Sequence, residues 1–176
     1  WDHLGVGLAD AKGDTIYNGA MDNAVGVATL IEVAKSLAKK PARRPVLLVA
    51  LTAEEKGLVG SDYFARNPVV PKDQLAANVN IDMPILTYDF VDMFAFGADR
   101  SSLGPLVEGA ITPLGLKLTP DPDPAEGLFT RSDQYRFVQA GVPALFMKTG
   151  FGAGGAASRI KARRSKYLNS STRRWG

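Results

Sequence analysis

Two adjacent glutamates, Glu54 and Glu55, stand three and four residues after an apolar stretch at residues 47–51 and precede Gly57. The apolar stretch predicts a buried strand, so two like charges stand at its mouth, where they repel each other and are costly to desolvate. One interpretation is a solvated turn that begins a helix, where the helix dipole favours glutamates. The other is chemical: one carboxylate binds a metal ion and its neighbour handles a proton, which requires two different environments.

Two further acids belong with this pair. Asp82 ends a predicted strand and Asp22 begins a predicted helix. Because functional groups of α/β folds gather beyond the carboxyl ends of the strands, we expect Asp22, Glu54, Glu55 and Asp82 at one edge of a sheet. Each acid also has a purely structural interpretation, as a helix cap, a strand-end cap or a helix start. Together, however, four carboxylates would repel one another without a cation, and hard oxygen ligands indicate zinc, manganese or magnesium.

The elements that must position these acids alternate between strands and helices. Expected helices cover residues 22–38, 58–66, 101–114 and 132–139, with Asp22 and Ser132 as N-caps; expected strands cover residues 45–52, 76–82, 89–96 and 142–147, and loops cover 1–17 and 117–127. This alternation predicts a mostly parallel central sheet with helices on both faces, a three-layer α/β/α fold.

The composition suits one globular domain followed by a different kind of segment. The chain has 176 residues, 45% of them hydrophobic, and no cysteine, which excludes disulfides and thiolate zinc sites. Residues 1–155 contain 14 basic and 18 acidic side chains, whereas residues 156–176 contain seven basic ones and no acid. We therefore expect an α/β core at 1–155 and a basic tail at 156–176 that is disordered or non-native, for example translated in a wrong frame.

Several partners are disfavoured by the same composition. A basic tail can bind nucleic acid or anionic membranes, but the rest of the chain has no basic stripe with interleaved aromatic residues, so we expect no nucleic-acid partner. No run of eighteen apolar residues is present, so we expect no membrane span. The oligomeric state cannot be read from the sequence.

Five segments carry a resemblance to a known family. They are "DHLG" at 2–5, "NGAMDNAVGVATLIEVA" at 18–34, "TAEEKGLVGS" at 52–61, "NIDM" at 80–83 and "RSDQYRFVQAGVPALF" at 131–146. In this order they resemble the bacterial di-zinc aminopeptidases, whose relatives include glutamate carboxypeptidases and glutaminyl cyclases. The resemblance covers residues 1 to about 152 and implies a zinc-exopeptidase-like α/β fold with two zinc ions.

The resemblance also implies a role for each acid. Asp22 resembles the carboxylate that bridges the two zinc ions, Glu55 a ligand of one zinc and Asp82 a ligand of the other. Glu54 resembles the general base that takes a proton from the activated water. Asp2 resembles the acid that orients a metal-binding histidine.

Two features of the family pattern need separate mention. The peptide bond after the bridging aspartate is often cis, so Asp22–Asn23 is a candidate for that geometry. The pattern also requires two histidine ligands, yet His3 is the only histidine and follows Asp2 instead of preceding it. We therefore expect a chain that is truncated at its N-terminus and divergent at its C-terminus, with weak or no metal binding and weak or no activity.

The leading functional prediction is a zinc-dependent aminopeptidase that hydrolyses N-terminal bonds of peptides with a free N-terminus. The alternatives are acyl transfer of the glutaminyl-cyclase type and a non-catalytic, peptidase-like binding domain. Phe129, Tyr135, Phe151 and Met83 are candidates for the substrate pocket, although aromatic residues at such spacings belong more often to the core. By analogy with exported relatives, we expect a periplasmic or secreted protein.

Overall fold

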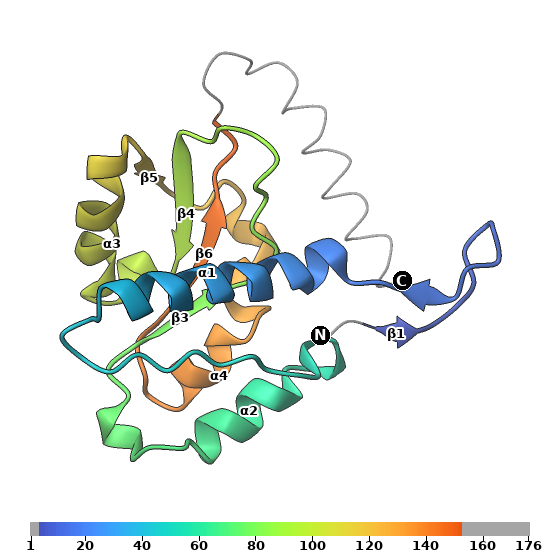
Figure 1. Ribbon diagram of the computed structural model, residues 1–176, viewed down its shortest axis with the longest axis horizontal. Coiled ribbons are helices and arrows are strands. Elements are labelled where there is room, and N and C mark those ends of the chain that lie inside the picture. The colour runs from blue at the N-terminus through green and yellow to red at the C-terminus, as the bar shows by residue number, and fades with distance from the viewer. Residues whose placement is uncertain (1–3, 153–176) are drawn as a thin grey trace.

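A four-stranded sheet forms the centre of the molecule. The computed structural model describes residues 4–152, and within them the sheet contains β3 (Asn78–Ile81), β6 (Ala144–Thr149), β4 (Asp92–Phe96) and β5 (Lys117–Thr119), in that order. β3 is parallel to β6 and β4 is parallel to β5, whereas β4 and β6 are antiparallel (Figure 1). The expected α/β fold with a mostly parallel sheet is thus confirmed.

Four α-helices accompany the sheet in the described part of the chain: α1 (Val25–Lys39), α2 (Val59–Arg66), α3 (Leu103–Ile111) and α4 (Gln134–Gln139). In Figure 1, α1 crosses in front of the sheet. α4 packs against β3 and β6 and also against α2, while α3 packs against β5. Among the described residues, no helix combines the length and the apolar character that crossing a membrane requires.

Two hydrophobic clusters hold these elements together. The first consists of Phe94, Phe96 and Phe146, with Leu128, Phe129 and Phe151 packed against it. Phe96 and Phe146 are opposite each other in the β4–β6 pairing, and their ring centroids are 5.5 Å apart. The second cluster joins Phe137 of α4 to Val142 and Ala144. The first cluster therefore lies directly behind the edge of the sheet where the acids were expected.

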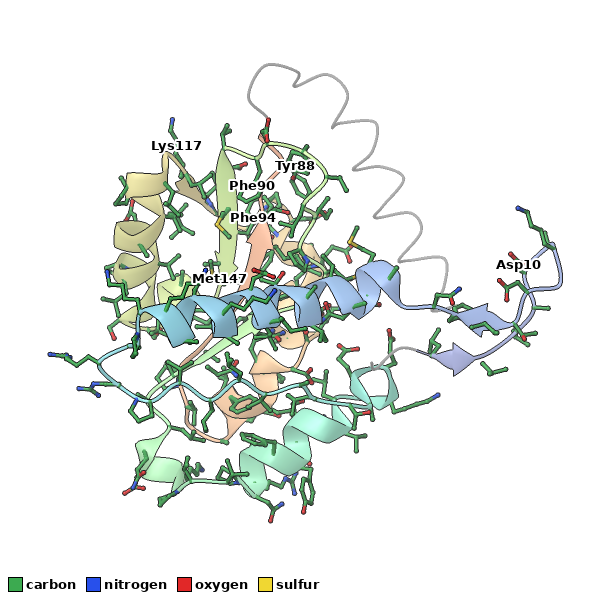
Figure 2. All side chains as sticks on the ribbon, viewed as in Figure 1. Asp10, Tyr88, Phe90, Phe94, Lys117 and Met147 are labelled. Carbon is green, nitrogen blue, oxygen red and sulfur yellow. The ribbon has the colours of Figure 1, made fainter. Side chains whose placement is uncertain are left out.

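The loop expected at residues 1–17 is wrong in part. Gly5–Val6 (β1) and Ile16–Tyr17 (β2) pair as a small antiparallel hairpin. The Asp10 carboxylate closes its turn by accepting hydrogen bonds from the backbone N–H groups of Lys12 (2.7 Å) and Asp14 (3.0 Å), and Figure 2 shows Asp10 at the far end of the hairpin. Lys117–Thr119, also expected as loop, is instead β5, because β4 offers it a parallel ladder.

The buried strand expected at residues 45–52 is also wrong. No strand is formed there, and the side chains of Val46, Leu47 and Leu48 are 51%, 44% and 41% exposed. A strand requires a neighbour that completes its backbone hydrogen bonds, and no strand within residues 4–152 pairs with this segment. The end of the segment is anchored, because Leu51 packs against the second cluster and the N–H of Gly60 donates to the carbonyl of Thr52 (3.0 Å).

Neither expected N-cap acts as one. Asp22 has non-helical dihedral angles (φ −115°, ψ 97°), and α1 begins three residues later. Asn23 provides the capping hydrogen bond instead, because its Oδ1 accepts from the N–H of Gly26 (3.1 Å). α4 begins at Gln134, and the hydroxyl of Ser132 donates to Asp82 instead of capping the helix. Asp22 and Ser132 instead line a cavity at the edge of the sheet.

Asp2, His3 and the 156–176 tail lie outside the described residues. What the sequence predicts for these residues therefore remains a prediction.

Candidate active site

A cavity of about 790 Å³ opens at the carboxyl end of β3 and β6. Four of the five predicted site residues line it, namely Asp22, Glu54, Glu55 and Asp82. The fifth, Asp2, lies outside the described residues. The cavity continues over an apolar wall that includes Phe94, Phe96, Phe146 and Phe151 of the first cluster, and Met83. Of the proposed pocket aromatics, Phe151 lines the cavity, whereas Phe129 and Tyr135 pack edge to face with centroids 6.4 Å apart.

Glu54 and Glu55 are presented by a tight turn. They begin a short 3₁₀ turn, Glu54–Lys56, which lies between two non-glycine residues with left-handed backbones, Ala53 (φ 58°) and Leu58 (φ 63°). Such conformations are costly and persist only where the surroundings enforce them. Here the N–H of Val59 donates to Ala53 (3.1 Å) and the guanidinium of Arg136 donates to the carbonyl of Gly57 (3.1 Å). The turn is thus fixed to α2 and α4.

The Glu54 carboxyl is strongly perturbed. Burial, together with the charges of Asp82, Asp133, Glu55 and Asp22, raises the pKa of Glu54 from its ordinary value of 4.5 to about 8. A carboxyl with this pKa can hold or release a proton near neutral pH. The environment of Glu54 therefore suits a carboxylate that handles a proton.

Asp82 has one carboxylate oxygen in use and one without a partner. Its Oδ2 accepts a hydrogen bond from the Ser132 hydroxyl (2.8 Å), whereas Oδ1 is buried and makes no hydrogen bond. Burial raises the pKa of Asp82, while the Lys148 charge and the Ser132 hydrogen bond act in the opposite direction. A buried, unsatisfied carboxylate oxygen is the kind of group that a cation would satisfy.

A buried polar network positions Asp82. The Nδ2 of Asn80 donates to the Ser132 hydroxyl (2.8 Å) and to the Oε1 of Gln134 (2.9 Å), and the Nε2 of Gln134 donates to the carbonyl of Phe129 (2.6 Å). Ser132 and Gln134 are 2% and 0% exposed. Gln134, the first residue of α4, thus holds Asn80 in place behind Asp82. The sequence did not reveal that Ser132 positions Asp82, because a serine before a helix also fits an N-cap.

Replacing Ser132 by alanine should lower the free energy of unfolding by about 1–3 kcal/mol, since it removes a hydrogen bond from a buried carboxylate. Urea denaturation in the presence of a chelator measures this loss. Ser102→Ala is the matched control, because Ser102 is exposed at the start of α3 and makes no side-chain capping bond. Equal effects of the two substitutions would contradict the positioning part of Ser132.

Asn23 connects the two halves of the site. Its Nδ2 donates to the carbonyl of Ile81 (3.2 Å), and its Oδ1 accepts from the N–H groups of Gly26 and Met83 (3.1 Å each). One amide thus joins the start of α1, next to Asp22, to the end of β3, next to Asp82. The Asp22–Asn23 peptide bond is cis, as the resemblance implied.

Lys148 adds a positive charge to this acidic edge. It lies near the end of β6, with its ammonium nitrogen 5.0 Å from the centroid of the Phe146 ring. Burial lowers the pKa of Lys148, while the charges of Asp82, Asp22 and Glu54 raise it. Lys148 was not predicted as a site residue, although a lysine that directly follows the apolar residues "ALFM" in a buried strand is itself unusual.

The donor chemistry of the cavity fits a divalent cation, since it consists of carboxylate oxygens of which at least one, Asp82 Oδ1, is unsatisfied. Within residues 4–152 the ligand set is incomplete, because no three Asp, Glu or His side chains come together closely enough to hold a metal ion. This part of the chain also contains no histidine.

Acids from three segments of the chain that line one cavity at the edge of an α/β sheet are typical of a metal-dependent hydrolase. The chain belongs to peptidase family M28, whose family model matches residues 1–169. The matched range includes much of the segment expected as a separate tail, and that expectation stays a prediction.

Individual relatives agree with the family. A protein of Pyrenophora tritici-repentis named "Probable zinc metalloprotease" is 35% identical over 74 residues, which are 42% of this chain and 17% of that protein. The aminopeptidase from Aneurinibacillus sp. strain AM-1 has a TM-score of 0.59 and 25% identity over 75% of this chain and 31% of its own. A glutaminyl cyclase of Bacteroides thetaiotaomicron shares the fold, with a TM-score of 0.55 and 18% identity over 84% of this chain and 57% of its own. The chain therefore matches only a part of each relative.

Proposed function

We propose that this chain is the core of a zinc-dependent aminopeptidase, which hydrolyses the first peptide bond of a substrate with a free N-terminus. Family membership supports peptide hydrolysis, and the similarity to a solved aminopeptidase supports removal of N-terminal residues. The observation that carries the proposal is the Glu54 carboxyl, whose pKa is raised to about 8 in the same cavity as Asp22, Glu55 and Asp82.

In this proposal the acids divide the work. Asp22, Glu55 and Asp82 would hold zinc, with Asp22 shared between two ions. Bound zinc supplies Lewis-acid chemistry, since it lowers the pKa of water and polarises a carbonyl group. Glu54 accepts the proton of the attacking water on a carboxylate oxygen and returns it to the leaving amine. Asp2 orients a metal-binding histidine.

The apolar wall of the cavity gives the substrate a place next to these acids. The side chains of Phe94, Phe96 and Phe146 exclude water from one side of the cavity, and lower solvation strengthens the electrostatic interactions of the acids. A general base is most effective when its pKa is close to the working pH, and a cation bound nearby would lower the pKa of Glu54 from its metal-free value.

The direct test is hydrolysis of leucine 4-nitroanilide by the chain with added zinc chloride. We expect slow release of nitroaniline that requires zinc and stops on addition of a chelator, because the described residues supply carboxylates but no imidazole. N-acetyl-leucine 4-nitroanilide is the control, since it has no free amine and should not be cleaved. Equal cleavage of both compounds, or cleavage that a chelator leaves unchanged, would contradict the proposal.

Two alternatives make different predictions in the same assay. A cyclase would release ammonia from a peptide with N-terminal glutamine and leave the nitroanilide intact; the shared fold at 18% identity does not favour it. A binding domain would bind peptide at saturating zinc without turnover. Export to the periplasm or out of the cell stays a prediction by analogy.

A further inference from the structure

Lys148 and Asp82 leave the sheet at neighbouring positions. β3 and β6 are parallel and in register, with Asn80 opposite Phe146 and Ile81 opposite Met147. Asp82 and Lys148 are the next residues of the two chains. Because directly adjacent residues of neighbouring strands point to the same face, their side chains lie on one side of the sheet.

The Phe146 ring fixes the lysine on this side. Residues two apart in a strand share a face, and the Lys148 ammonium lies 5.0 Å from the Phe146 centroid, which is a cation–π distance. Phe146 is itself buried in the first hydrophobic cluster, at 3% exposure. The Lys148 ammonium therefore lies against a buried ring, and Lys148 lines the cavity.

The charge of Lys148 faces three acids. Burial lowers the pKa of Lys148, and the charges of Asp82, Asp22 and Glu54 oppose that shift. These acids come from three different segments of the chain, and Lys148 brings a positive charge to the cavity that all three line. Within residues 4–152, Lys148 is also the only basic side chain besides Arg131 that lines the cavity.

We propose that Lys148 is a positioning residue that serves as the internal counter-cation of the acidic cavity, so that a divalent cation binds there against its charge. This inference rests on the proposed metal site. The ammonium stabilises the acids when no metal is present, and it lowers the metal affinity of the same acids, because two cations in one cavity repel each other. The incomplete ligand set of the described residues and the charge of Lys148 then both lower the affinity of the cavity for a divalent cation.

Isothermal titration of zinc into the metal-free chain tests the inference. Lys148→Met keeps the length of the side chain and removes its charge, and its dissociation constant for zinc should fall roughly tenfold or more. Lys148→Arg keeps the charge and should remain within about threefold of the unchanged chain. Lys117→Met is the matched control, since Lys117 is exposed on β5 and Figure 2 shows it at the outer end of the sheet; its zinc affinity should not change.

Thermal unfolding in a chelator provides a second readout that does not depend on activity. Zinc should raise the unfolding temperature of Lys148→Met by more than it raises that of the unchanged chain, because the variant binds zinc more tightly. If this variant is unfolded without metal, circular dichroism during a zinc titration replaces calorimetry, and refolding at a zinc concentration below the dissociation constant of the unchanged chain supports the inference.

Three results would overturn it: Lys148→Met binds zinc no more tightly than the unchanged chain, Lys148→Arg behaves as Lys148→Met does, or the unfolded methionine variant does not refold with zinc. If the unchanged chain binds zinc tightly and Lys148→Met binds it no more tightly, only the proposed role of Lys148 is excluded. Absence of zinc binding in both chains removes the proposed metal site as well.

Discussion

Glu54→Gln should lower the rate of zinc-dependent hydrolysis by roughly a hundredfold or more, because general acid–base catalysis typically contributes 10²–10⁴-fold. Glutamine has nearly the same shape as glutamate but cannot accept the proton of the attacking water. Zinc affinity, measured by calorimetry, should change much less than the rate, since Glu54 is proposed to move a proton and not to hold the metal.

The same substitution should stabilise the metal-free chain at alkaline pH. The pKa of Glu54 is about 8 in the folded chain against an ordinary value of 4.5, so the folded state retains a proton that the unfolded state has lost between these values. Stability therefore falls as pH rises through this window. Glutamine carries no charge, so the difference in urea midpoint between variant and parent should be near zero at about pH 4.5 and largest above about pH 8.

Glu108→Gln is the matched control, because Glu108 is exposed on α3. It should leave both the rate and the pH dependence of stability unchanged. A Glu54→Gln chain that hydrolyses the substrate as fast as its parent would exclude Glu54 as the base, and a pH-independent stability difference would exclude the raised pKa.

Asp82→Asn should have the largest effect on zinc binding. The substitution removes the charge of a carboxylate with an unpartnered buried oxygen, and loss of a direct ligand should weaken zinc binding by more than the roughly 10–100-fold known for residues that merely support a ligand. Without metal, the variant should be more stable than its parent at neutral pH, because burial raises the pKa of Asp82 and makes its charge costly.

Thermal unfolding with and without zinc measures both effects at once. Zinc should raise the unfolding temperature of the parent, since binding to the folded state stabilises it by mass action, and should leave that of Asp82→Asn unchanged. Asp73→Asn is the control, since Asp73 is exposed in the turn before β3, and zinc should stabilise it as it does the parent. An equal zinc effect on Asp82→Asn would show that Asp82 is not a ligand.

The convergence of Asp22 and Asp82 could be predicted because it depends on topology. Asp82 follows β3 and Asp22 precedes α1, and in an α/β fold such positions share one edge. Glu54 and Glu55 reach the same cavity although the strand expected before them is not formed. The structure places all four in one cavity. Their roles as ligands and base come from the resemblance and remain to be measured.

The environment of the acids could not be predicted, because it depends on side chains that are far apart in the sequence. Ser132 reaches Asp82 across 50 residues, and Asn23 reaches Ile81 across 58. A local pattern cannot distinguish such a serine from a helix cap. The strand expected at 45–52 failed for a related reason: an apolar pattern shows which residues could be buried, whereas burial requires a neighbour.

In concentrated solution, the exposed side chains of Val46, Leu47 and Leu48 lower colloidal stability, because they can attract one another between molecules. An apolar segment with unpaired backbone groups is a template for edge-to-edge pairing between molecules. Arg43 and Arg44 stand just before it, separated from it by Pro45, and their like charges oppose such pairing. Because salt screens that repulsion while apolar attraction persists, pairing through this segment should increase with ionic strength.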